Sequence, residues 1–534
     1  MEQCGIFAIM RTVPRLSFSQ NSTKEKTWLH WRKMAVKRIL GLLFAIIMLA
    51  GCGNSFAEGQ KAPDYILEGF DGENSTRSWE TNLFFSRMEE RTGISFQFRE
   101  YTTYSRYLSR KESIRNREDL PDVLFKAELN AGEVRDLYEA GVLIDLKPYL
   151  QQYAPDLWKL LQERPDILTA ISMRDGAIPA LPAVNELQNN DVMWINSAWL
   201  RRLRLDMPTD AESLKEVLKA FRDNDPNANG KKDEIPLAFI GMWELRFLGH
   251  AFGITDNDYY VSVKDGKVTS SLISQQNRDF LAWLNELWKE KLIDHNGFST
   301  ADSLRTITDE KASIPYGLIL SSSPVTVLPA SALSSYILMD PLVYEGKQEY
   351  RDLSGDLIRG TFAITSRCKE PEKLVSWVNF LYTEEGALMA QYGLEGKEYA
   401  FREDGMWEWT EDKTTIAQSV IPVSTIGTGA AMPGICPVDF QLKYSDTEAR
   451  DDISQLIQFR KYTVLPYPYV TLDREDEKTV AEIQKNLSKY AENTMAQFVT
   501  GDIPLNDEQW NQFCKTVEEK GLNEMISVWQ KYIQ

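Results

Sequence analysis

The chain has 534 residues, with 60 basic and 78 acidic side chains and a net charge of −18. Residues 1–51 hold eight of the basic and two of the acidic residues, so the rest of the chain carries a net charge of −24. Nucleic acid and anionic lipid headgroups need a basic surface, so this balance disfavours both as partners. With 43% hydrophobic residues, the chain has enough apolar material for two or three globular lobes.

The first predicted element is a short apolar run over residues 39–50, which follows the basic pair Lys37 and Arg38. Such a run is too short to span a bilayer and is typical of a secretory signal. It ends in Leu-Ala-Gly-Cys at residues 49–52, which resembles the bacterial lipobox. We therefore predict a lipoprotein signal peptide over residues 34–51, a lipid on Cys52 and a protein held on the extracellular side of the cell membrane. The alternative is an ordinary signal peptide with a chance cysteine.

Residues 1–33 contain no second apolar core, and Met34 begins a complete signal sequence. We interpret residues 1–33 as a gene-model extension ahead of the true start; the alternative is an unusually long charged lead. Residues 52–62 are small and polar after the cysteine, which predicts a short tether between lipid and folded body.

The folded body begins with alternating strand and helix signals. Strands are predicted at residues 65–70, 94–98 and 120–125. A helix capped within residues 75–78 and ended by Gly93 lies between the first two strands, and a short helix at 133–140 follows the third. Strands separated by helices predict βαβ units in a mainly parallel sheet.

Glycine and proline then interrupt the pattern at residues 176–182, which predicts a segment that crosses to a second lobe within residues 176–190. Strands are predicted there at 192–195 and 235–240, with helices at 197–204 and near 280–293. Another helix has Leu214, Val217, Leu218 and Phe221 on one face, with a capping box of Thr209 and Glu212.

A strand at residues 360–365 is predicted to follow a return crossing near 356–361, and a helix at 371–383 follows it. The last hundred residues show helical stripes, one of which is ended by Gly501. These signals predict a first lobe from residues 63–183 and 359–425. The second lobe is predicted from 184–358 and a helical part at 426–534.

Cysteine and histidine are too scarce for several kinds of site. Beyond Cys52 only Cys368, Cys436 and Cys514 remain, which permit at most one disulfide. His250 and His295 have no metalloprotease or nucleophile-elbow context, so both are interpreted as structural or surface residues.

Several short motifs together resemble extracellular solute-binding lipoproteins of ABC importers, in the large oligosaccharide branch that includes alginate-binding proteins. The motifs are Leu-Pro-Asp-Val at 120–123, Gly-Val-Leu-Ile-Asp-Leu at 141–146, Met-Trp-Ile-Asn at 193–196 with Trp199-Leu200, the 223–234 loop, Lys-Leu-Ile-Asp at 291–294, Tyr-Gly-Leu-Glu-Gly at 392–396, and Phe-Val-Thr-Gly at 498–501 with Trp510. The resemblance implies a two-lobed periplasmic-binding-protein-like fold (type II), in which each lobe is a mainly parallel sheet flanked by helices and the C-terminal region is helical. It also implies a ligand held in the cleft between the lobes.

The family implies an aromatic and polar cleft, and open α/β sheets bind ligands beyond the carboxyl ends of their strands. The loops predicted there lie at residues 72–79, 126–130 and 241–246. Trp79 and Trp243 are predicted to stack on sugar faces, and Arg77, Lys126 and Glu244 to bond hydroxyls or carboxylates. Trp194 and Tyr316 are weaker candidates. The alternative for any single aromatic residue is packing in the core.

Residues 225–234 place oxygen-bearing side chains at every second position and a glycine at the sixth, which lets one loop wrap a hard cation. The closing acid stands at position ten instead of twelve, a departure from the EF-hand that is similar to the calcium loop of alginate-binding proteins. That similarity implies a structural Ca²⁺ held by the side chains of Asp225, Asn227, Asn229, Asp233 and Glu234 and by the carbonyl of Lys231. The alternative is a polar turn.

The leading hypothesis is a monomeric, lipid-anchored protein that captures an oligosaccharide for the permease subunits of an ABC importer. It implies no enzymatic activity and no contact with the membrane except through the lipid. One alternative is a surface glycosidase or lyase with paired carboxylates in the cleft. Others are a peptide or glycolipid cargo, or sensing without transport.

Overall fold

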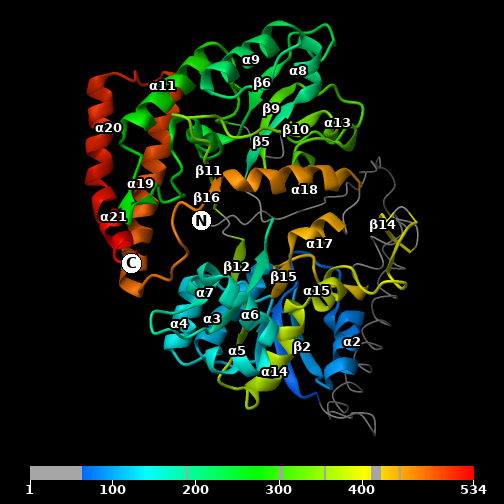
Figure 1. Ribbon diagram of the computed structural model, residues 1–534. Coiled ribbons are helices and arrows are strands. Elements are labelled where there is room, and N and C mark those ends of the chain that lie inside the picture. Colours follow the sequence, from blue (N-terminus) through cyan, green and yellow to red (C-terminus); the bar gives the residue numbers. More distant parts are fainter. Residues whose placement is uncertain are drawn as a thin grey trace, which may run out of the picture. The chain divides into compact units, whose positions relative to one another are not determined.

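The computed structural model describes residues 63–187, 191–299, 305–353, 356–403, 405–410, 423–443 and 447–533. Helices and strands alternate around two separate sheets (Figure 1), which confirms the predicted α/β class. The signal peptide, Cys52 and the tether lie outside the described residues. No helix within the described ranges is long and apolar enough to cross a membrane.

The first sheet has six strands in the order β15-β4-β12-β3-β1-β2. Its strands are β1 (Tyr65–Phe70), β2 (Phe96–Tyr101), β3 (Val123–Phe125), β4 (Ala180–Asn185), β12 (Leu357–Ile364) and β15 (Gly434–Cys436). β1 pairs in parallel with both β2 and β3, as the βαβ pattern predicts. Because β15 belongs to this sheet, the chain leaves the first lobe later than the predicted boundary at residue 425.

β4 and β12 carry the two predicted crossings and pair with each other in antiparallel fashion, and a third crossing follows β15. The sequence predicts an irregular crossing at residues 176–182, but residues 180–185 are a full strand of the sheet. A chain that leaves a sheet along one strand and returns beside it must run in the opposite direction on the way back. β12 therefore also lies antiparallel to β3, and the sheet is mixed.

The second sheet has four strands in the order β10-β5-β9-β6. They are β5 (Val192–Asn196), β6 (Ile235–Ala238), β9 (Tyr316–Ser321) and β10 (Tyr336–Leu338). Only the β6–β9 pair is parallel, whereas β5 is antiparallel to both β9 and β10. The prediction of a mainly parallel sheet is wrong for this lobe, because β5 enters from the crossing segment and so runs against β9.

The strand directions place the carboxyl ends of both sheets at the crossing. β4 runs parallel to β1 and β3, since all three are related through the antiparallel β12, and β4 leads from its carboxyl end into the second lobe. In the second lobe the amino end of β5 receives the chain, and this end lies beside the carboxyl ends of β9 and β6. We call the carboxyl ends of β1, β2, β3 and β4 the first edge. We call the carboxyl ends of β6 and β9, together with the amino end of β5, the second edge.

Helices pack around each sheet. The first lobe has α2 (Leu83–Thr92), α3 (Tyr104–Arg115), α4 (Ala131–Glu139), α5 (Lys147–Tyr153), α6 (Pro155–Glu163), α7 (Pro165–Ile171), α14 (Pro371–Asn379), α15 (Glu384–Gln391) and the hairpin β13 (Tyr399–Phe401)–β14 (Trp407–Trp409). The second lobe has α8 (Ser197–Leu203), α9 (Ala211–Asp223), α10 (Gly241–Leu245), α11 (Gln275–Lys289), α13 (Ala330–Leu333) and the hairpin β7 (Ser262–Lys264)–β8 (Lys267–Thr269).

The C-terminal helices complete the core of the second lobe. They are α19 (Arg474–Thr500), α20 (Asp507–Glu519) and α21 (Leu522–Gln530), and their apolar stripes pack into the same cluster as the second sheet. Gly501 ends α19 in a left-handed conformation, as predicted. Between the sheets run α17 (Val438–Lys443), α18 (Thr447–Phe459) and the small pair β11 (Tyr350–Arg351)–β16 (Thr463–Val464) (Figure 1).

Two predicted helix caps are wrong. Asn82, and not a residue of 75–78, caps α2 by accepting a hydrogen bond from the Phe84 amide, because a short 3₁₀ turn at Trp79–Thr81 intervenes. In α9 the capping box joins Asp210 and Ser213, one residue after the predicted pair. Aspartate and threonine are both good N-cap residues, and here the Asp210 carboxylate takes the N-cap position in place of the predicted Thr209.

Candidate functional site

The first edge presents hydroxyl, amide and carboxylate groups. The exposed side chains after β1 are Glu73, Asn74, Thr76, Ser78 and Glu80, and Asn130 follows the turn after β3. Residues 425–429, which we call the strip, also reach this edge, and Gly427 to Gly429 are exposed. These groups suit a polyhydroxylated ligand, because hydroxyls both donate and accept hydrogen bonds.

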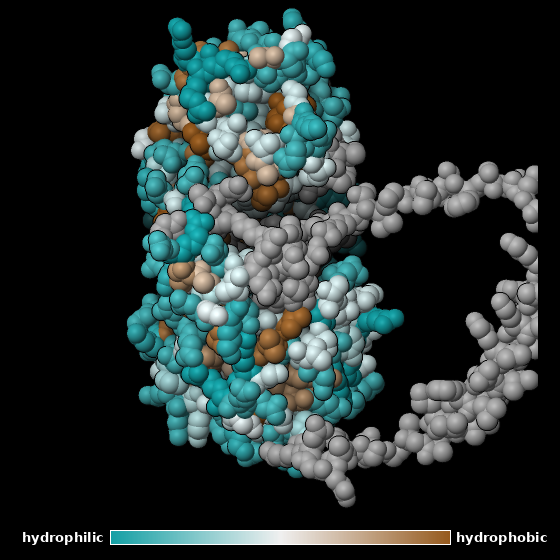
Figure 2. Space-filling view, turned by 90° about the vertical axis from the view of Figure 1, so that its right-hand side faces the viewer, coloured by the Kyte–Doolittle hydropathy of each residue, from teal (hydrophilic) through white to brown (hydrophobic). Residues whose placement is uncertain are grey.

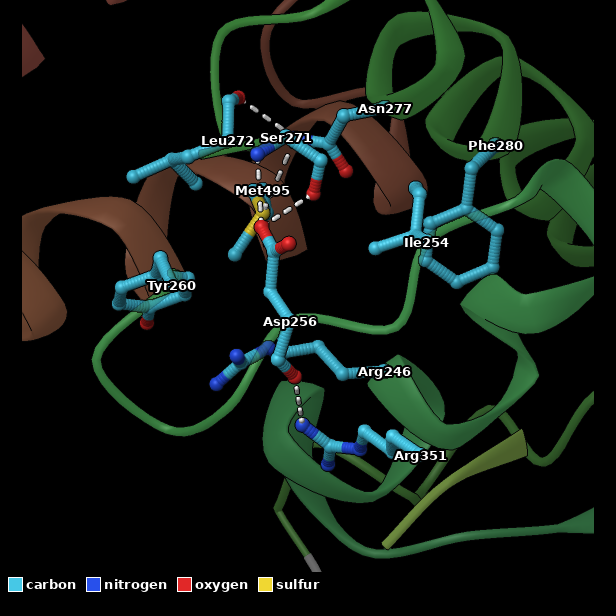
Figure 3. Close-up of a pocket in the computed structure, with 10 residues that line it drawn as sticks. All are labelled: Arg246, Ile254, Asp256, Tyr260, Ser271, Leu272, Asn277, Phe280, Arg351 and Met495. Atoms are coloured by element: carbon cyan, nitrogen blue, oxygen red, sulfur yellow. Dashed lines mark hydrogen bonds between the residues drawn. The ribbon is translucent and has the colours of Figure 1, made fainter. Parts of the chain in front are cut away.

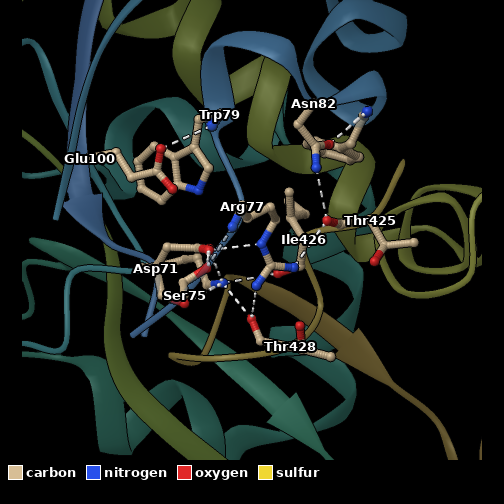
Figure 4. A network of polar contacts seen from close by, with 11 residues as sticks. Asp71, Ser75, Arg77, Trp79, Asn82, Glu100, Thr425, Ile426 and Thr428 are labelled. Atoms are coloured by element: carbon tan, nitrogen blue, oxygen red, sulfur yellow. Dashed lines mark hydrogen bonds and ion pairs between the residues drawn. The ribbon is translucent and has the colours of Figure 1, made fainter. Parts of the chain in front are cut away.

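Beneath this surface, Asp71 forms a buried ion cluster with Lys126 and Arg77. Figure 4 shows Asp71 and Arg77 of this cluster beside Thr425 and Thr428. The Lys126 Nζ lies 2.8 Å from Asp71 Oδ1, and the Arg77 Nε lies 2.7 Å from Oδ2. Burial alone favours the neutral form of Asp71, but the two cations outweigh it and lower its pKa. Burial lowers the pKa of Lys126 to about 8, a shift that the Asp71 charge opposes.

The same two cations hold the backbone of residues 425–428. Lys126 donates to the carbonyls of Ile426 (3.0 Å) and Thr428 (2.7 Å), and Arg77 donates to those of Thr425 (3.0 Å) and Thr428 (2.8 Å). Both residues therefore lie at the predicted edge, but in place of the predicted bonds to ligand hydroxyls or carboxylates their cations bond Asp71 and the backbone of residues 425–428. The sequence analysis missed this strip, for which the Gly-Thr-Gly at 427–429 is the one signal.

Gly429 is required where the strip meets the loop after β1. Its φ of +86° lies in the left-handed region, and a Cβ there would stand 1.9 Å from the Asp71 carbonyl oxygen. The close approach lets the strip lie directly on the first edge.

Trp79 does not fit its predicted role as a sugar platform. The side chain is fully buried, and its ring lies 5.7 Å from that of Phe125 and 5.8 Å from that of Phe85. The 3₁₀ turn at Trp79–Thr81 directs it under the sheet, where no ligand reaches its face. It belongs to the aromatic core of the first lobe.

The second edge carries one exposed tryptophan. Trp243 lies on α10, directly after β6, and is 45% exposed. The next residue, Glu244, is fully buried and faces Arg305, whose Nη1 lies 2.8 Å from Oε1. Burial raises the pKa of Glu244 to about 8, against the opposing charge of Arg305. Trp243 thus stands at the surface and is not packed in the core, whereas Glu244, predicted to bond a ligand, is buried and pairs with Arg305.

Trp194 and Tyr316 are core residues, which is the alternative that the sequence analysis left open for aromatic candidates. Trp194 is fully buried and donates from Nε1 to the Ser321 carbonyl at 3.0 Å. Tyr316 donates from its hydroxyl to the Arg305 carbonyl at 3.0 Å. Both lie on central strands of the second sheet, so their rings pack between sheet and helices.

α18 lies across the second edge. Gln455 accepts a hydrogen bond from the Leu338 amide of β10 at 2.8 Å. Asp451 is exposed, and Asp452 is half-buried beside Ser323 of the loop after β9. Burial raises the pKa of Asp452 to about 6. α18 therefore adds two carboxylates to this edge.

A small cavity inside the second lobe is too small for a sugar (Figure 3). Its volume is about 20 Å³, which holds about one water. Asp256 accepts from the Ser271 hydroxyl at 2.5 Å, and its carbonyl accepts from Arg351 at 3.2 Å. Burial lowers the pKa of Arg351 to about 10. These contacts fasten the β11 segment to the lobe.

The 225–234 loop is a tight polar turn whose side chains bond one another. Asn229 and Gly230 donate their amides to the Asp225 carboxylate at 3.1 Å each, and Asn227 and Asn229 donate to Asp233 at 3.0 Å. Oε1 of Glu234 is buried without a hydrogen-bond partner. Burial, followed by the charges of Asp233 and Asp225, raises its pKa.

The donor set of this loop fits a hard cation. An unpartnered buried carboxylate oxygen is costly, and a metal ligated at that position would satisfy it. In the described ranges, no three His, Cys, Asp or Glu side chains converge on one point. The loop would thus depend on the oxygens of Asn227 and Asn229 and the Lys231 carbonyl as well as on its acids.

The face of the two lobes that Figure 2 shows is chiefly hydrophilic, with separate apolar patches. Cys368, Cys436 and Cys514 are free thiols, so no disulfide joins them. His250 is buried and His295 is exposed against Trp288.

Comparisons with known proteins agree with this geometry. No family model matches the chain. The chain is 26% identical to the fructooligosaccharide ABC transporter substrate-binding protein FusA of Streptococcus pneumoniae serotype 4, over 92% of this chain and 96% of that protein. Among solved structures, an extracellular solute-binding protein from Bifidobacterium longum subsp. infantis matches with a TM-score of 0.76 and 21% identity, over 90% of this chain and 99% of that one. An EF-hand mutant of FusA in complex with fructo-nystose matches with a TM-score of 0.67 and 24% identity, over 88% of this chain and 98% of that one.

Proposed function

We propose that this protein is a substrate-binding protein of an ABC transporter, which captures an oligosaccharide between its first and second edges and delivers it to an importer. The observation that carries the proposal is the alignment with FusA over nearly the whole of both chains. The two facing carboxyl edges support it, since open sheets bind ligands there. We infer that the protein works as a monomer.

Trp243 is the residue that we assign to sugar stacking. It is a large exposed aromatic side chain on the second edge, and an apolar sugar face packs well on an indole ring. On the first edge, Asn74, Thr76 and Asn130 would bond hydroxyls, supported from below by Lys126 and Arg77.

The alternative of a surface glycosidase or lyase is disfavoured, because the relatives are binding proteins and not enzymes. The cations and acids beneath the two edges are held in buried ion pairs, which suits support more than proton transfer. Incubation with polysaccharides followed by a reducing-end assay separates the two functions, since new ends appear only if the chain cleaves its ligand.

The test of capture is a glycan-library screen followed by titration calorimetry with the best ligand. We expect Trp243→Ala to weaken binding at least tenfold and Trp243→Phe, which keeps an aromatic face, to retain most of the affinity. Both variants should melt like wild type, because the side chain packs little. Equal affinity in all three proteins would remove Trp243 from the site.

We also propose that Cys52 carries the lipid that anchors the protein outside the cell. Acyl chains contribute about 0.8 kcal/mol per buried CH₂, so two or three chains hold a protein stably. Cys52→Ser should release the protein or leave its precursor unprocessed. A mature N-terminus other than Cys52, without lipid, contradicts the assignment.

We propose a structural Ca²⁺ in the 225–234 loop, with support from the unpartnered Glu234 oxygen and from the EF-hand of FusA. Asp225, Asn227, Asn229, Asp233, Glu234 and the Lys231 carbonyl would hold it. The ion would join the end of α9 to the start of β6 and neutralise three acids, so it stabilises the second lobe by RT ln(1 + [L]/Kd), roughly 2.7 kcal/mol at a hundredfold excess.

The melting temperature should therefore fall with chelator and recover with Ca²⁺ in preference to Mg²⁺. Asp233→Ala with Glu234→Ala should abolish the response. Asp223→Ala is the matched control, because this acid lies just outside the loop and pairs with Arg222. If the double variant responds to calcium like the control, the loop is only a turn.

A further inference from the structure

We propose that the captured oligosaccharide is neutral and that the site disfavours uronates, sulfated sugars and other polyanionic glycans. This inference rests on the proposed function and names its substrate class. It is drawn from the charges around the two edges: the buried cations are engaged with protein groups, and the exposed charged side chains of the loop after β1 and of α18 are acids.

At the first edge both cations are already saturated. Lys126 is fully buried and uses its ammonium on Asp71, Ile426 O and Thr428 O. Arg77 is only 8% exposed and uses its guanidinium on Asp71 and on two carbonyls of the 425–428 strip. A ligand carboxylate could recruit either cation only by breaking this cluster and leaving the buried Asp71 with one cation in place of two, which is unfavourable.

At the second edge the buried cation Arg305 is likewise engaged with protein groups. Arg305 contacts both oxygens of Glu244, at 2.8 and 2.9 Å, and donates to the Leu320 carbonyl at 3.2 Å. Arg246 donates to the Asn257 carbonyl at 2.7 Å and lies 4.1 Å from the centre of the Tyr260 ring. Neither guanidinium is presented as an open fork for a carboxylate or sulfate.

Among the described residues of the loop after β1 and of α18, the exposed charged side chains are acids, whereas Arg106, which follows β2, is an exposed cation on the first edge. Glu73 and Glu80 are exposed on the first edge, and Asp451 with Asp452 lies on α18 at the second. Carboxylates accept hydrogen bonds from sugar hydroxyls but repel a second carboxylate nearby. The net charge of −24 beyond residue 51 adds a long-range repulsion against polyanions. Local and overall electrostatics therefore favour the same class of ligand.

The experiment compares ligands that differ only in charge. The best binder from a screen of neutral and acidic oligosaccharides is converted to its charged counterpart, by oxidation of primary alcohols to carboxylates or by the reverse reduction. Calorimetry then measures both forms with the full chain after its signal peptide. We expect the neutral form to bind at least tenfold more tightly at low salt, with the difference shrinking at about 0.5 M salt as screening increases.

A charge variant tests whether the acids of α18 cause the preference for the neutral ligand. Asp451→Asn with Asp452→Asn should improve binding of the charged form several-fold relative to the neutral form. Glu475→Gln with Asp507→Asn, at the starts of α19 and α20, is the matched control for net charge and should leave the ratio unchanged. Tighter binding of the anionic form by wild type overturns the inference while the capture function stands. If no sugar of either class binds, the capture function itself is refuted, and this inference with it.

Discussion

Among single residues, Lys126 has the largest predicted effect on stability. Its ammonium is fully buried, and its removal would leave Asp71 with one cation and would take away a donor from the carbonyls of Ile426 and Thr428, of which Thr428 keeps Arg77. Breaking one side of a buried ion pair costs about 3–5 kcal/mol. We expect Lys126→Met to lose that much in urea unfolding, whereas Lys373→Met, in an exposed pair with Glu370, should change stability far less, because solvent screens that pair. Equal effects would show that the cluster is dispensable.

His250 makes a residue-scale prediction on pH. Its Nδ1 lies 2.7 Å from the Phe247 carbonyl, and its Nε2 accepts from the Leu342 amide at 2.9 Å, so the ring must be neutral. Burial lowers its pKa from 6.5 to about 4. Because the unfolded chain takes up the proton first, stability falls as pH drops from about 6.5 toward 4, by roughly 2 kcal/mol at pH 5.

The measurement is chemical unfolding of wild type and His250→Gln at pH 7.5 and pH 5. The variant keeps an acceptor and a donor but does not titrate, so its stability relative to wild type should improve at the lower pH. His295→Gln, at an exposed ring, is the control. A gap that stays constant with pH would mean that His250 is not buried in the neutral form.

Among the elements, β12 depends most on one glycine. Gly360 sits at the irregularity between Ile358 and Phe362, with φ +66°, and a Cβ there would lie 2.0 Å from the Leu129 carbonyl oxygen. Gly360→Ala should cost clearly more than the roughly 1–2 kcal/mol of left-handed strain alone. Gly266→Ala is the control, because its φ of +73° is similar and a Cβ would meet nothing within 4 Å. Similar losses in thermal unfolding would show that β12 yields at this point.

The sequence predicts elements well where one local pattern decides them. Residues 65–70 form β1 with the predicted bounds, and Gly93 ends α2 because only a left-handed residue fits there. Direction within the sheets was not predictable from spacing, since β5 and β12 run as the crossing between lobes requires. The site was partly predictable from the sequence. Lys126 and Arg77 lie at the expected edge, but the burial of their side chains depends on residues 425–428, which are distant in the sequence. Trp79 and Trp243 have the same side chain, and only tertiary packing distinguishes them.

In the whole molecule, the two lobes are joined by more than the paired strands β4 and β12. Arg135 of α4 contacts Glu477 of α19 at 2.6 Å, and Arg474 contacts Asp136 at 3.0 Å. Gly132 makes room for the Glu477 carboxylate, since a Cβ there would stand 2.3 Å from its oxygen. α4 belongs to the first lobe and α19 to the second, so these charges fasten the lobes on the side where α19 begins.

Such a connection favours a hinge motion over sliding. Two adjacent antiparallel strands can flex together at the point where they leave the sheet, while the ion pairs keep the start of α19 beside α4. A ligand that contacts Trp243 on one edge and the 427–429 strip on the other then gains contacts only when the edges approach. We therefore expect a ligand that contacts both edges to shift the population toward a closed form.

Small-angle scattering should accordingly show a smaller radius of gyration when the ligand found by screening is added to saturation. Trp243→Ala at the same sugar concentration should stay extended if its site is unfilled, and should compact when the sugar is raised to saturate the variant. This second arm separates lost affinity from lost motion. A radius that does not change in saturated wild type would mean that the two edges form a rigid platform, with the ligand bound on a surface that is already assembled.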